Sequence, residues 1–97
     1  MNMQAMLKQA QALQKDMMKT KEEVDNMEFT GESSFVKVTV NGKKDVVSVD
    51  INSDSLDSDD IEALQDMLVV AINQANKKVD DTLEQKMGKF GNIPGLF

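Results

Sequence analysis

The sequence contains no cysteine, histidine, tryptophan or tyrosine, and lysine supplies all eleven of its basic side chains. Without cysteine the chain can form neither a disulfide nor a thiolate metal site, so nothing indicates an oxidising compartment. Without histidine it lacks the commonest general base and the commonest zinc ligand, which excludes a Ser–His–Asp triad. These absences predict a protein that is not an enzyme.

Long apolar runs are also missing. The longest one, residues 67–72, contains six residues, whereas a helix that spans a bilayer needs about 20. The N-terminus has no basic segment followed by an apolar one, so no signal peptide is expected. The length of 97 residues suits one small domain, residues 1–97, and we expect a soluble cytoplasmic protein with no membrane partner.

Residues 2–27 are predicted to form one long helix. No glycine or proline interrupts them, and most of their side chains favour helix. Apolar residues recur at alternating steps of three and four with a single polar exception, which is the heptad pattern of a helix that packs along a seam. At 1.5 Å per residue this helix would be roughly 40 Å long. The seam comprises Met3, Met6, Ala10, Leu13, Met17, Thr20, Val24 and Met27.

The middle of the chain is predicted to form an antiparallel sheet, because valines alternate with polar residues and turn residues separate the alternating segments. A four-residue loop over residues 41–44 would place Val38 opposite Val47 and Val36 opposite Val49, so that the valines share one face. The predicted strands are residues 28–32, 35–40 and 46–51.

A second long helix is predicted over residues 58–88. Asp57 is a good N-cap, and the acidic residues that follow it complement the positive end of the helix dipole. Gly88 or Gly91 would end the helix. Residues 89–97 are predicted to be a flexible tail with an apolar end. The fold class is therefore α+β, with the element order α-β-β-β-α.

Two helices of this length do not fit inside a compact domain of about 100 residues, whose radius of gyration is near ~13 Å. Their apolar faces need long partners, and a small sheet gains stability by joining a second copy across a two-fold axis. We therefore expect a homodimer. The residues predicted to form its core and dimer seam are Met6, Leu13, Met17, Val24, Val38, Val47, Leu64 and Leu68.

A run of acidic residues raises the question of a metal site. Asp50, Asn52 and Asp54 match the first three ligand positions of an EF-hand loop. The match then fails, since Ser55 stands where the loop needs glycine and Ile61 where it needs a bidentate glutamate. A strand end, a loop and a helix N-terminus explain these acids, so we expect no metal, no cofactor, no catalytic carboxylate pair and no small-molecule substrate.

The charge is segregated along the chain. The net charge of −6 argues, at face value, against a nucleic-acid partner. Residues 1–21, however, carry four lysines and one aspartate, for +3, whereas residues 45–66 carry eight acids and no base, for −8. Residues 67–89 carry four lysines and three acids, for +1. Lysine stripes on helices can follow phosphates, although a lysine-lined helix face is usually only solvated.

The sequence closely resembles the YbaB/EbfC family of bacterial nucleoid-associated DNA-binding proteins over essentially its whole length. Five segments carry the resemblance: the Met-, Gln- and Lys-rich helix 3–27, VKVTVNG at 36–42, DDIExLxDxL at 59–68, AxNxA at 71–75, and KMG at 86–88 with PGLF at 94–97. The resemblance implies a tweezer-like homodimer that binds double-stranded DNA in the nucleoid with little sequence preference and influences nucleoid organisation and gene expression.

The same resemblance associates DNA binding with the N- and C-terminal helices. Because arginine is missing, bidentate contacts to guanine are not available, and lysine contacts to phosphates would position the protein without specifying a sequence. The candidate DNA-binding residues are Lys8, Lys15, Lys19, Lys21, Lys77, Lys78, Lys86 and Lys89.

A second hypothesis stays open. The order of helices and strands, with heptad helices, superficially resembles prefoldin-type chaperone subunits, which build coiled-coil arms on a β base. Such a coiled-coil tweezer, a chaperone or adaptor, would bind protein segments and would be insensitive to salt. Composition alone favours this hypothesis, whereas the family resemblance favours DNA.

Overall fold

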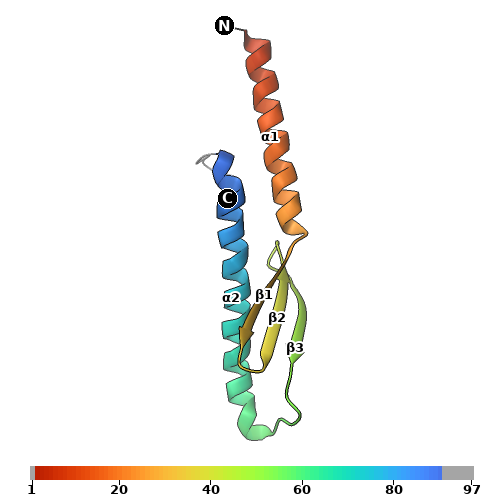
Figure 1. Ribbon diagram of the computed structural model, residues 1–97, viewed down its shortest axis with the longest axis vertical. Coiled ribbons are helices and arrows are strands. Elements are labelled where there is room, and N and C mark those ends of the chain that lie inside the picture. The colour runs from red at the N-terminus through yellow and green to blue at the C-terminus, as the bar shows by residue number, and fades with distance from the viewer. Residues whose placement is uncertain (1, 91–97) are drawn as a thin grey trace.

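In a computed structural model of the chain, which describes residues 2–90, a long helix leads into three strands and a second long helix follows them (Figure 1). This order confirms the predicted α-β-β-β-α fold class. The elements are α1 (Met3–Asp25), β1 (Glu28–Ser33), β2 (Val36–Asn41), β3 (Val46–Ile51), the 3₁₀ turn η1 (Ser58–Asp60), α2 (Ile61–Met87) and the 3₁₀ turn η2 (Gly88–Phe90).

Helix α1 is capped by the Asn2 side chain at its N-terminal end and by the Asn26 backbone N–H at its C-terminal end. The Asn2 side chain accepts hydrogen bonds from the backbone N–H groups of Gln4, at 3.0 Å, and Ala5, at 3.4 Å, which satisfies two donors of the first turn. The helix ends at Asp25, two residues before the predicted end at residue 27. Met27 therefore lies beyond the helix, so the predicted seam does not extend to it.

Helix α2 begins with a capping box. The Asp57 carboxylate accepts a hydrogen bond from the Asp59 N–H at 2.9 Å, and the Asp60 carboxylate accepts one from the Asp57 N–H at 3.0 Å. Asp57 is thus the N-cap that the sequence predicts, although the first turn is 3₁₀ and the α-helix starts at Ile61. These bonds explain why acidic residues gather before α2.

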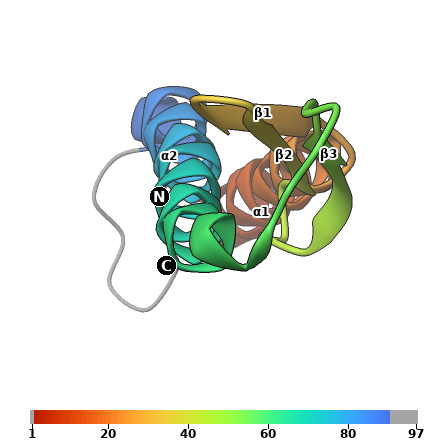
Figure 2. The same ribbon diagram turned by 90° about the horizontal axis from the view of Figure 1, so that it is seen from below.

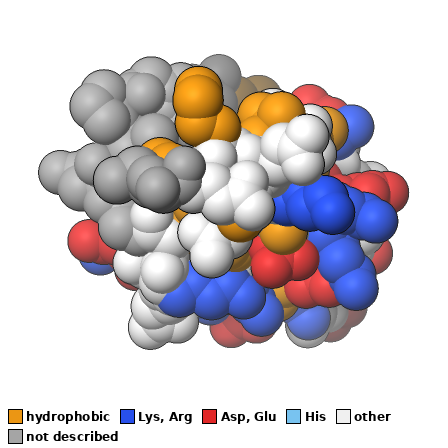
Figure 3. Space-filling model, turned by 90° about the horizontal axis from the view of Figure 1, so that it is seen from above, with side chains coloured by type: hydrophobic (Ala, Val, Ile, Leu, Met, Phe, Trp, Pro, Cys, Tyr) orange, Lys and Arg blue, Asp and Glu red, His pale blue; other side chains and the backbone are white. Residues whose placement is uncertain are grey.

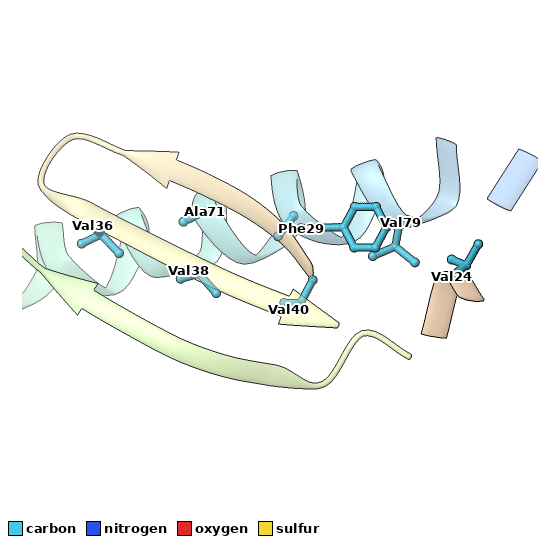
Figure 4. Packing of buried hydrophobic residues seen from close by; sticks show 8 residues of the cluster. Val24, Phe29, Val36, Val38, Val40, Ala71 and Val79 are labelled. Atoms are coloured by element: carbon cyan, nitrogen blue, oxygen red, sulfur yellow. The ribbon is translucent and has the colours of Figure 1, made fainter. Parts of the chain in front are cut away.

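The three strands form an antiparallel sheet in the order β1-β2-β3, and α2 packs across β1 and β2 (Figure 2). In Figure 4 the side chains of Val36, Val38 and Val40 lie along β2 over α2, and Phe29 lies beside Val79. The buried core lies in this layer between sheet and helix. It consists of Val24, Phe29, Val36, Val38, Val40, Ala71, Ala75 and Val79.

Two glycines allow close backbone approach around this core. A Cβ atom on Gly31 of β1 would overlap the carbonyl oxygen of Ala71 in α2. A Cβ atom on Gly42 would overlap the carbonyl oxygen of Val24 near the end of α1, and the Gly42 N–H donates to the Asp25 carbonyl at 3.2 Å. Gly31 thus brings the sheet onto α2, and Gly42 anchors α1 to the β2–β3 connection.

The register between β2 and β3 differs from the prediction by two residues. Val38 lies opposite Val49, and Val36 lies opposite Ile51, so the predicted Val38–Val47 pairing is wrong. One residue of the difference arises at the turn, because Val40 pairs with Val46 and not with Asp45 as a four-residue loop would require. The second arises at a bulge, because the ladder changes step between Thr39 and Val40 and leaves Val47 as the extra residue. At Val38 the register shift is two residues, and side chains on a strand alternate between faces with a period of two. The apolar residues of β2 and β3 therefore still share one face, as predicted.

The Asn41 side chain explains where this strand pair begins. Its oxygen accepts hydrogen bonds from the N–H groups of Lys43, at 2.8 Å, and Asp45, at 3.1 Å. Lys44 adopts the left-handed conformation, with φ at 68°, which the turn requires. The Asn41 side chain therefore organises the turn. The sequence pattern alone did not reveal these hydrogen bonds.

The molecule is elongated, with extents of 71 × 19 × 15 Å and a radius of gyration of 19.3 Å. Figure 1 shows why: α1 leaves the sheet and projects past the end of α2. Among residues 2–90, no helix combines the length and apolarity that crossing a membrane would require. Helix α1 is therefore an arm that extends beyond the small sheet, whereas much of α2 packs across β1 and β2.

Candidate nucleic-acid interface

Three lysines form a stripe on α1. Lys8, Lys15 and Lys19 are all exposed, and at 100° per residue they fall within about 40° of one another around the helix axis. Their spacings along the axis are about 10 Å and about 6 Å. We call these three residues the α1 lysine stripe.

The stripe lies opposite the packed face of α1. Met17, Thr20 and Val24 are the buried residues of this helix, and their mean direction is roughly 150° from that of the α1 lysine stripe. Because the helix packs through one face, the three ammonium groups project into solvent. This geometry keeps them available to a large polyanion.

Other candidate lysines are tied to neighbouring groups. The Lys21 ammonium lies 3.3 Å from the Asp25 carboxylate, and the Lys77 ammonium lies 3.5 Å from that of Asp81, both in i,i+4 pairs on a helix surface. The Lys78 ammonium donates a 2.6 Å hydrogen bond to the backbone carbonyl of Thr30 in β1. These three lysines therefore have local partners, whereas the α1 lysine stripe has no ion pair or hydrogen bond of this kind within residues 2–90.

The last two candidates lie near the end of α2, which runs beside α1 (Figure 1). Lys86 is in the last turn of the helix, where a cation complements the negative end of its dipole. Lys89 lies in η2, with its ammonium 4.9 Å from the centre of the Phe90 ring. Lys86 and Lys89 thus add positive charge on the helix neighbouring α1.

The acidic residues lie toward the other end of the molecule. The segment 45–66, with its charge of −8, contains β3, the connection to α2 and the first turns of α2, which occupy the lower half of the molecule in Figure 1. Figure 3, which views the molecule from the end where α1 begins, shows lysines over its right and lower parts with acids between them. The fold therefore converts a charge pattern along the chain into a charge gradient along the molecule.

The predicted core and dimer seam is divided by the structure. Met17, Val24 and Val38 are buried, and Leu64 and Leu68 are partly buried. Met6, Leu13 and Val47 are exposed in the single chain. The first group stabilises the fold of one protomer, whereas the second group lacks cover within residues 2–90.

The apolar surface of β3 is the feature that sequence reasoning missed. Every residue of β3 is exposed, although its alternation predicted a half-buried strand. Helix α2 packs on β1 and β2 and leaves β3 uncovered. The sequence did contain a signal for this exposure, because its strands carry more alternating valines than the predicted helices can cover. The exposed apolar residues of β3 and of the first turns of α2 are Val46, Val47, Val49, Ile51, Ile61, Val69 and Val70.

The two edges of the sheet differ. Along β1, α2 supplies hydrogen bonds to the backbone, because the Glu32 N–H donates to the Gln74 side chain at 3.1 Å and Lys78 donates to the Thr30 carbonyl. The outer edge of β3 has no such helix beside it in the part of the chain that the structure describes. An exposed apolar edge strand is a template for pairing with another chain.

The acidic residues do not assemble a metal site in the described part of the chain. Among residues 2–90, no group of three histidine, cysteine, aspartate or glutamate side chains is placed to hold an ion. Asp57 and Asp60 instead accept hydrogen bonds at the start of α2.

Comparison with known proteins is consistent with this surface. A family model described as the YbaB/EbfC DNA-binding family matches residues 1–93. A protein of Pelotomaculum thermopropionicum named nucleoid-associated protein is 46% identical, over 99% of this chain and 96% of its own length. A nucleoid-associated protein of Streptococcus suis is 45% identical, over 97% of this chain and 98% of its own length.

The fold also matches a solved structure. The crystal structure of an uncharacterized protein from Helicobacter pylori aligns with a TM-score of 0.77, over 95% of this chain and 99% of that one, at 24% sequence identity. At this identity the likeness concerns the fold alone. It shows that the helix–sheet–helix arrangement exists in a chain of quite different sequence.

Proposed function

The chain belongs to the YbaB/EbfC DNA-binding family, and from this premise we propose that it is a nucleoid-associated protein that binds double-stranded DNA through its helical arms. The observation that carries the proposal is the α1 lysine stripe, which faces solvent opposite the packed side of the helix. In a bacterial cell, such binding would influence nucleoid organisation and gene expression.

The lysine geometry supports binding to phosphates with little sequence preference. The α1 lysine stripe extends about 16 Å along the helix axis, a length over which duplex DNA presents several phosphates on each strand. Lysine is a point charge without the planar fork that reads guanine, so its contacts position the protein without specifying bases. Lys86 and Lys89 extend this surface, whereas Lys21, Lys77 and Lys78 have local partners and contribute less.

The charge gradient supports a single orientation on DNA. Phosphates respond to charges within about one Debye length, roughly 8 Å at physiological salt. The net charge of −6 is an average over the whole chain, so the acidic lower end need not weaken binding at the arms. We propose that the arms face the duplex and the segment 45–66 points away from it.

The β3 edge supports a homodimer. Four of its exposed side chains are apolar, Val46, Val47, Val49 and Ile51, each between 41% and 54% exposed. A second copy that pairs along this edge would cover them and satisfy the free backbone groups of β3. Two protomers would then present two arms, and each would carry its own α1 lysine stripe.

The DNA-binding proposal is tested with a charge-matched pair of variants. Replacing Lys8, Lys15 and Lys19 with glutamine removes three positive charges from α1, and replacing Lys37, Lys43 and Lys44 with glutamine removes three from the sheet and its hairpin. We expect the first variant to bind a defined duplex about tenfold more weakly or worse, because its contacts to phosphates are lost. Each lost contact should also lower the slope of log K against log salt concentration by about 0.9. The second variant should bind like the wild type.

A gel-shift titration across a salt series measures both quantities. Equal losses in the two variants would show that only net charge matters, and an unchanged salt slope in the α1 variant would refute the proposed surface. Far-UV circular dichroism of both variants confirms that the fold is intact.

The dimer is tested separately. Replacing Val49 with glutamate places a charge in the middle of β3, opposite Val38. We expect this variant to sediment as a monomer at concentrations at which the wild type sediments as a dimer. Replacing Lys43 with glutamine gives the same charge change of −1 in the turn and should leave the dimer intact. A dimeric Val49→Glu variant would show that β3 is not the interface.

One observation favours the alternative function, a tweezer that binds protein segments. Met6 and Leu13 are exposed on α1 within the described residues 2–90. Such a tweezer would bind unfolded polypeptide independently of salt, because apolar contacts are not screened by ions. Retention on unfolded protein at high salt, together with no retention on DNA at low salt, would establish this alternative.

A further inference from the structure

The N-terminal half of α1 stands clear of the rest of residues 2–90. Every residue from Asn2 to Asp16 is exposed, and α1 projects past the end of α2 (Figure 1). Residues 3–16 form about 21 Å of helix, with a diameter of about 10–12 Å. The major groove of duplex DNA is about 12 Å wide and admits such a helix, whereas the minor groove, at about 6 Å, does not. This part of α1 therefore has the dimensions of a helix that enters the major groove.

One face of this segment carries three glutamines and a leucine. Gln4, Leu7, Gln11 and Gln14 recur at steps of three and four, so they lie within about 80° around the helix axis. All four side chains are exposed. The remaining glutamine of α1, Gln9, points to the opposite side of the helix. We call Gln4, Leu7, Gln11 and Gln14 the α1 amide face.

The fold does not use the amides of this face. Within residues 2–90 the three glutamine side chains of the α1 amide face take part in no hydrogen bond, whereas Gln74 of α2 accepts one from the Glu32 N–H at 3.1 Å. A glutamine amide carries both a donor group and an acceptor oxygen. Three such groups in a row on an exposed helix can therefore bind a ligand that presents donors and acceptors side by side.

The major-groove edge of adenine presents this pair. Its N7 accepts a hydrogen bond and its N6 amino group donates one, so a glutamine amide can bind both at once. Guanine presents two acceptors there, and the amide oxygen would face one of them. Leu7, which is 59% exposed, lies among the glutamines, and an apolar side chain suits the methyl group of thymine. The α1 amide face thus complements A·T pairs better than G·C pairs.

The lysines are placed to hold the helix in this orientation. The α1 lysine stripe lies about 80° around the axis from the α1 amide face. When the amides face the floor of the groove, the lysines point toward the phosphates along one wall. The buried side of α1, at Met17, Thr20 and Val24, lies about 130° away in the other direction. Packing of α1 on the rest of the protomer therefore leaves both faces free.

We propose that the N-terminal half of α1 lies in the major groove and that Gln4, Gln11 and Gln14 bind adenines, which gives the protein a preference for A·T-rich duplexes. This inference rests on the proposed DNA binding and deepens it. The lysine contacts supply affinity for any duplex, and the glutamines add discrimination between base pairs. One recognition helix contacts about three successive base pairs, so the preference concerns base composition and not a long defined sequence.

Binding of the full chain to three duplexes of equal length tests the proposal. They consist of A·T pairs, of G·C pairs and of inosine·cytosine pairs. Inosine is guanine without its 2-amino group, so its pair keeps the major-groove edge of G·C but presents the minor-groove edge of A·T. At one fixed salt concentration we expect the A·T duplex to bind at least fivefold more tightly than the other two. An inosine·cytosine duplex that binds like A·T would place the preference in the minor groove and overturn the proposal.

Alanine substitutions on two sides of α1 give the matched comparison, because alanine keeps the helix and leaves the charge unchanged. Gln11→Ala, in the middle of the α1 amide face, should lower the preference for A·T at least twofold. The triple variant Gln4→Ala, Gln11→Ala, Gln14→Ala should abolish it. Gln9→Ala, on the opposite side, should keep it, and the salt slope should stay the same in all of them because no lysine is lost. A triple variant that keeps the preference would overturn the proposal.

The outcomes also separate this inference from the proposed function. Equal binding of the three duplexes by the wild type, with a salt slope that falls when Lys8, Lys15 and Lys19 are replaced, would overturn the recognition of A·T pairs and leave DNA binding by α1 in place. A wild type that binds none of the duplexes at low salt would overturn both. Far-UV circular dichroism of the variants checks that their helix content is unchanged, so that a lost preference reports on lost contacts.

Discussion

Replacing Gly31 with alanine is expected to destabilise the protein, because β1 lies directly against the backbone of α2 at this residue. The added Cβ atom would overlap the Ala71 carbonyl oxygen and lie 2.8 Å from the Ala75 amide nitrogen. Both obstacles are backbone atoms on successive turns of α2. Neither can move away by a change of side-chain rotamer, so sheet and helix would have to separate.

The size of the effect follows from the packing. An extra methyl group in a packed interior costs about 1–3 kcal/mol, and a rigid backbone obstacle places Gly31→Ala near about 3 kcal/mol. Alanine also restricts the unfolded chain, which offsets about 0.7 kcal/mol. The expected loss in the free energy of unfolding is therefore about 2 kcal/mol. With an m-value of about 1.5 kcal/mol/M, the urea midpoint falls by roughly 1.3 M.

Urea unfolding followed by far-UV circular dichroism measures this loss, at one fixed protein concentration because association would stabilise the fold. Gly88→Ala is the matched control. A Cβ atom on Gly88 meets no atom within 4 Å, and its backbone is helical, with φ −60° and ψ −30°. This variant should gain up to about 1 kcal/mol. If Gly31→Ala unfolds within about 0.5 kcal/mol of the wild type, β1 and α2 are not held this close and the reasoning fails.

Further stability predictions use the same assay. Gly42→Ala should lose about 2 kcal/mol, since its Cβ atom would overlap the Val24 carbonyl oxygen, and an unchanged midpoint would contradict the close contact between α1 and the hairpin. Asp57→Ala should lose about 1 kcal/mol through the broken capping box, whereas Asp54→Ala, three residues earlier in the loop, should change little. Lys78→Ala should lower the free energy of unfolding by about 1 kcal/mol, because the hydrogen bond to the Thr30 carbonyl is lost. Its affinity for DNA should stay near that of the wild type. A large loss of affinity would show that Lys78 contacts DNA.

Much of the fold could be predicted because its signals are local. The change from helical to alternating spacing locates the sheet, and Asp57 marks the start of α2 because a capping side chain bonds to N–H groups two or three residues away. The β2–β3 register could not be predicted in the same way. It depends on a bulge at Val47 and on the hydrogen bonds of the Asn41 side chain, and several loop lengths fit the same alternation.

The candidate site was predictable to a similar extent. Heptad-like spacing places Lys8, Lys15 and Lys19 on one face of a helix, and the structure places that face opposite the packed one. The sequence could not separate these lysines from Lys78, whose partner Thr30 is 48 residues away along the chain. Hydrogen bonds between distant segments, such as this one, arise only when the chain folds.

The sequence by itself excluded thiol and imidazole chemistry, determined the order of the elements and segregated the charge along the chain, because each of these follows from residue identity or from spacing within a few residues. The tertiary structure decided which apolar residues are buried, since a sheet of three strands offers more apolar surface than one helix can cover. Within residues 2–90 it therefore leaves β3 and the N-terminal part of α1 open. Burial is a property of neighbours in space, and those neighbours come from segments that the linear pattern does not relate to one another.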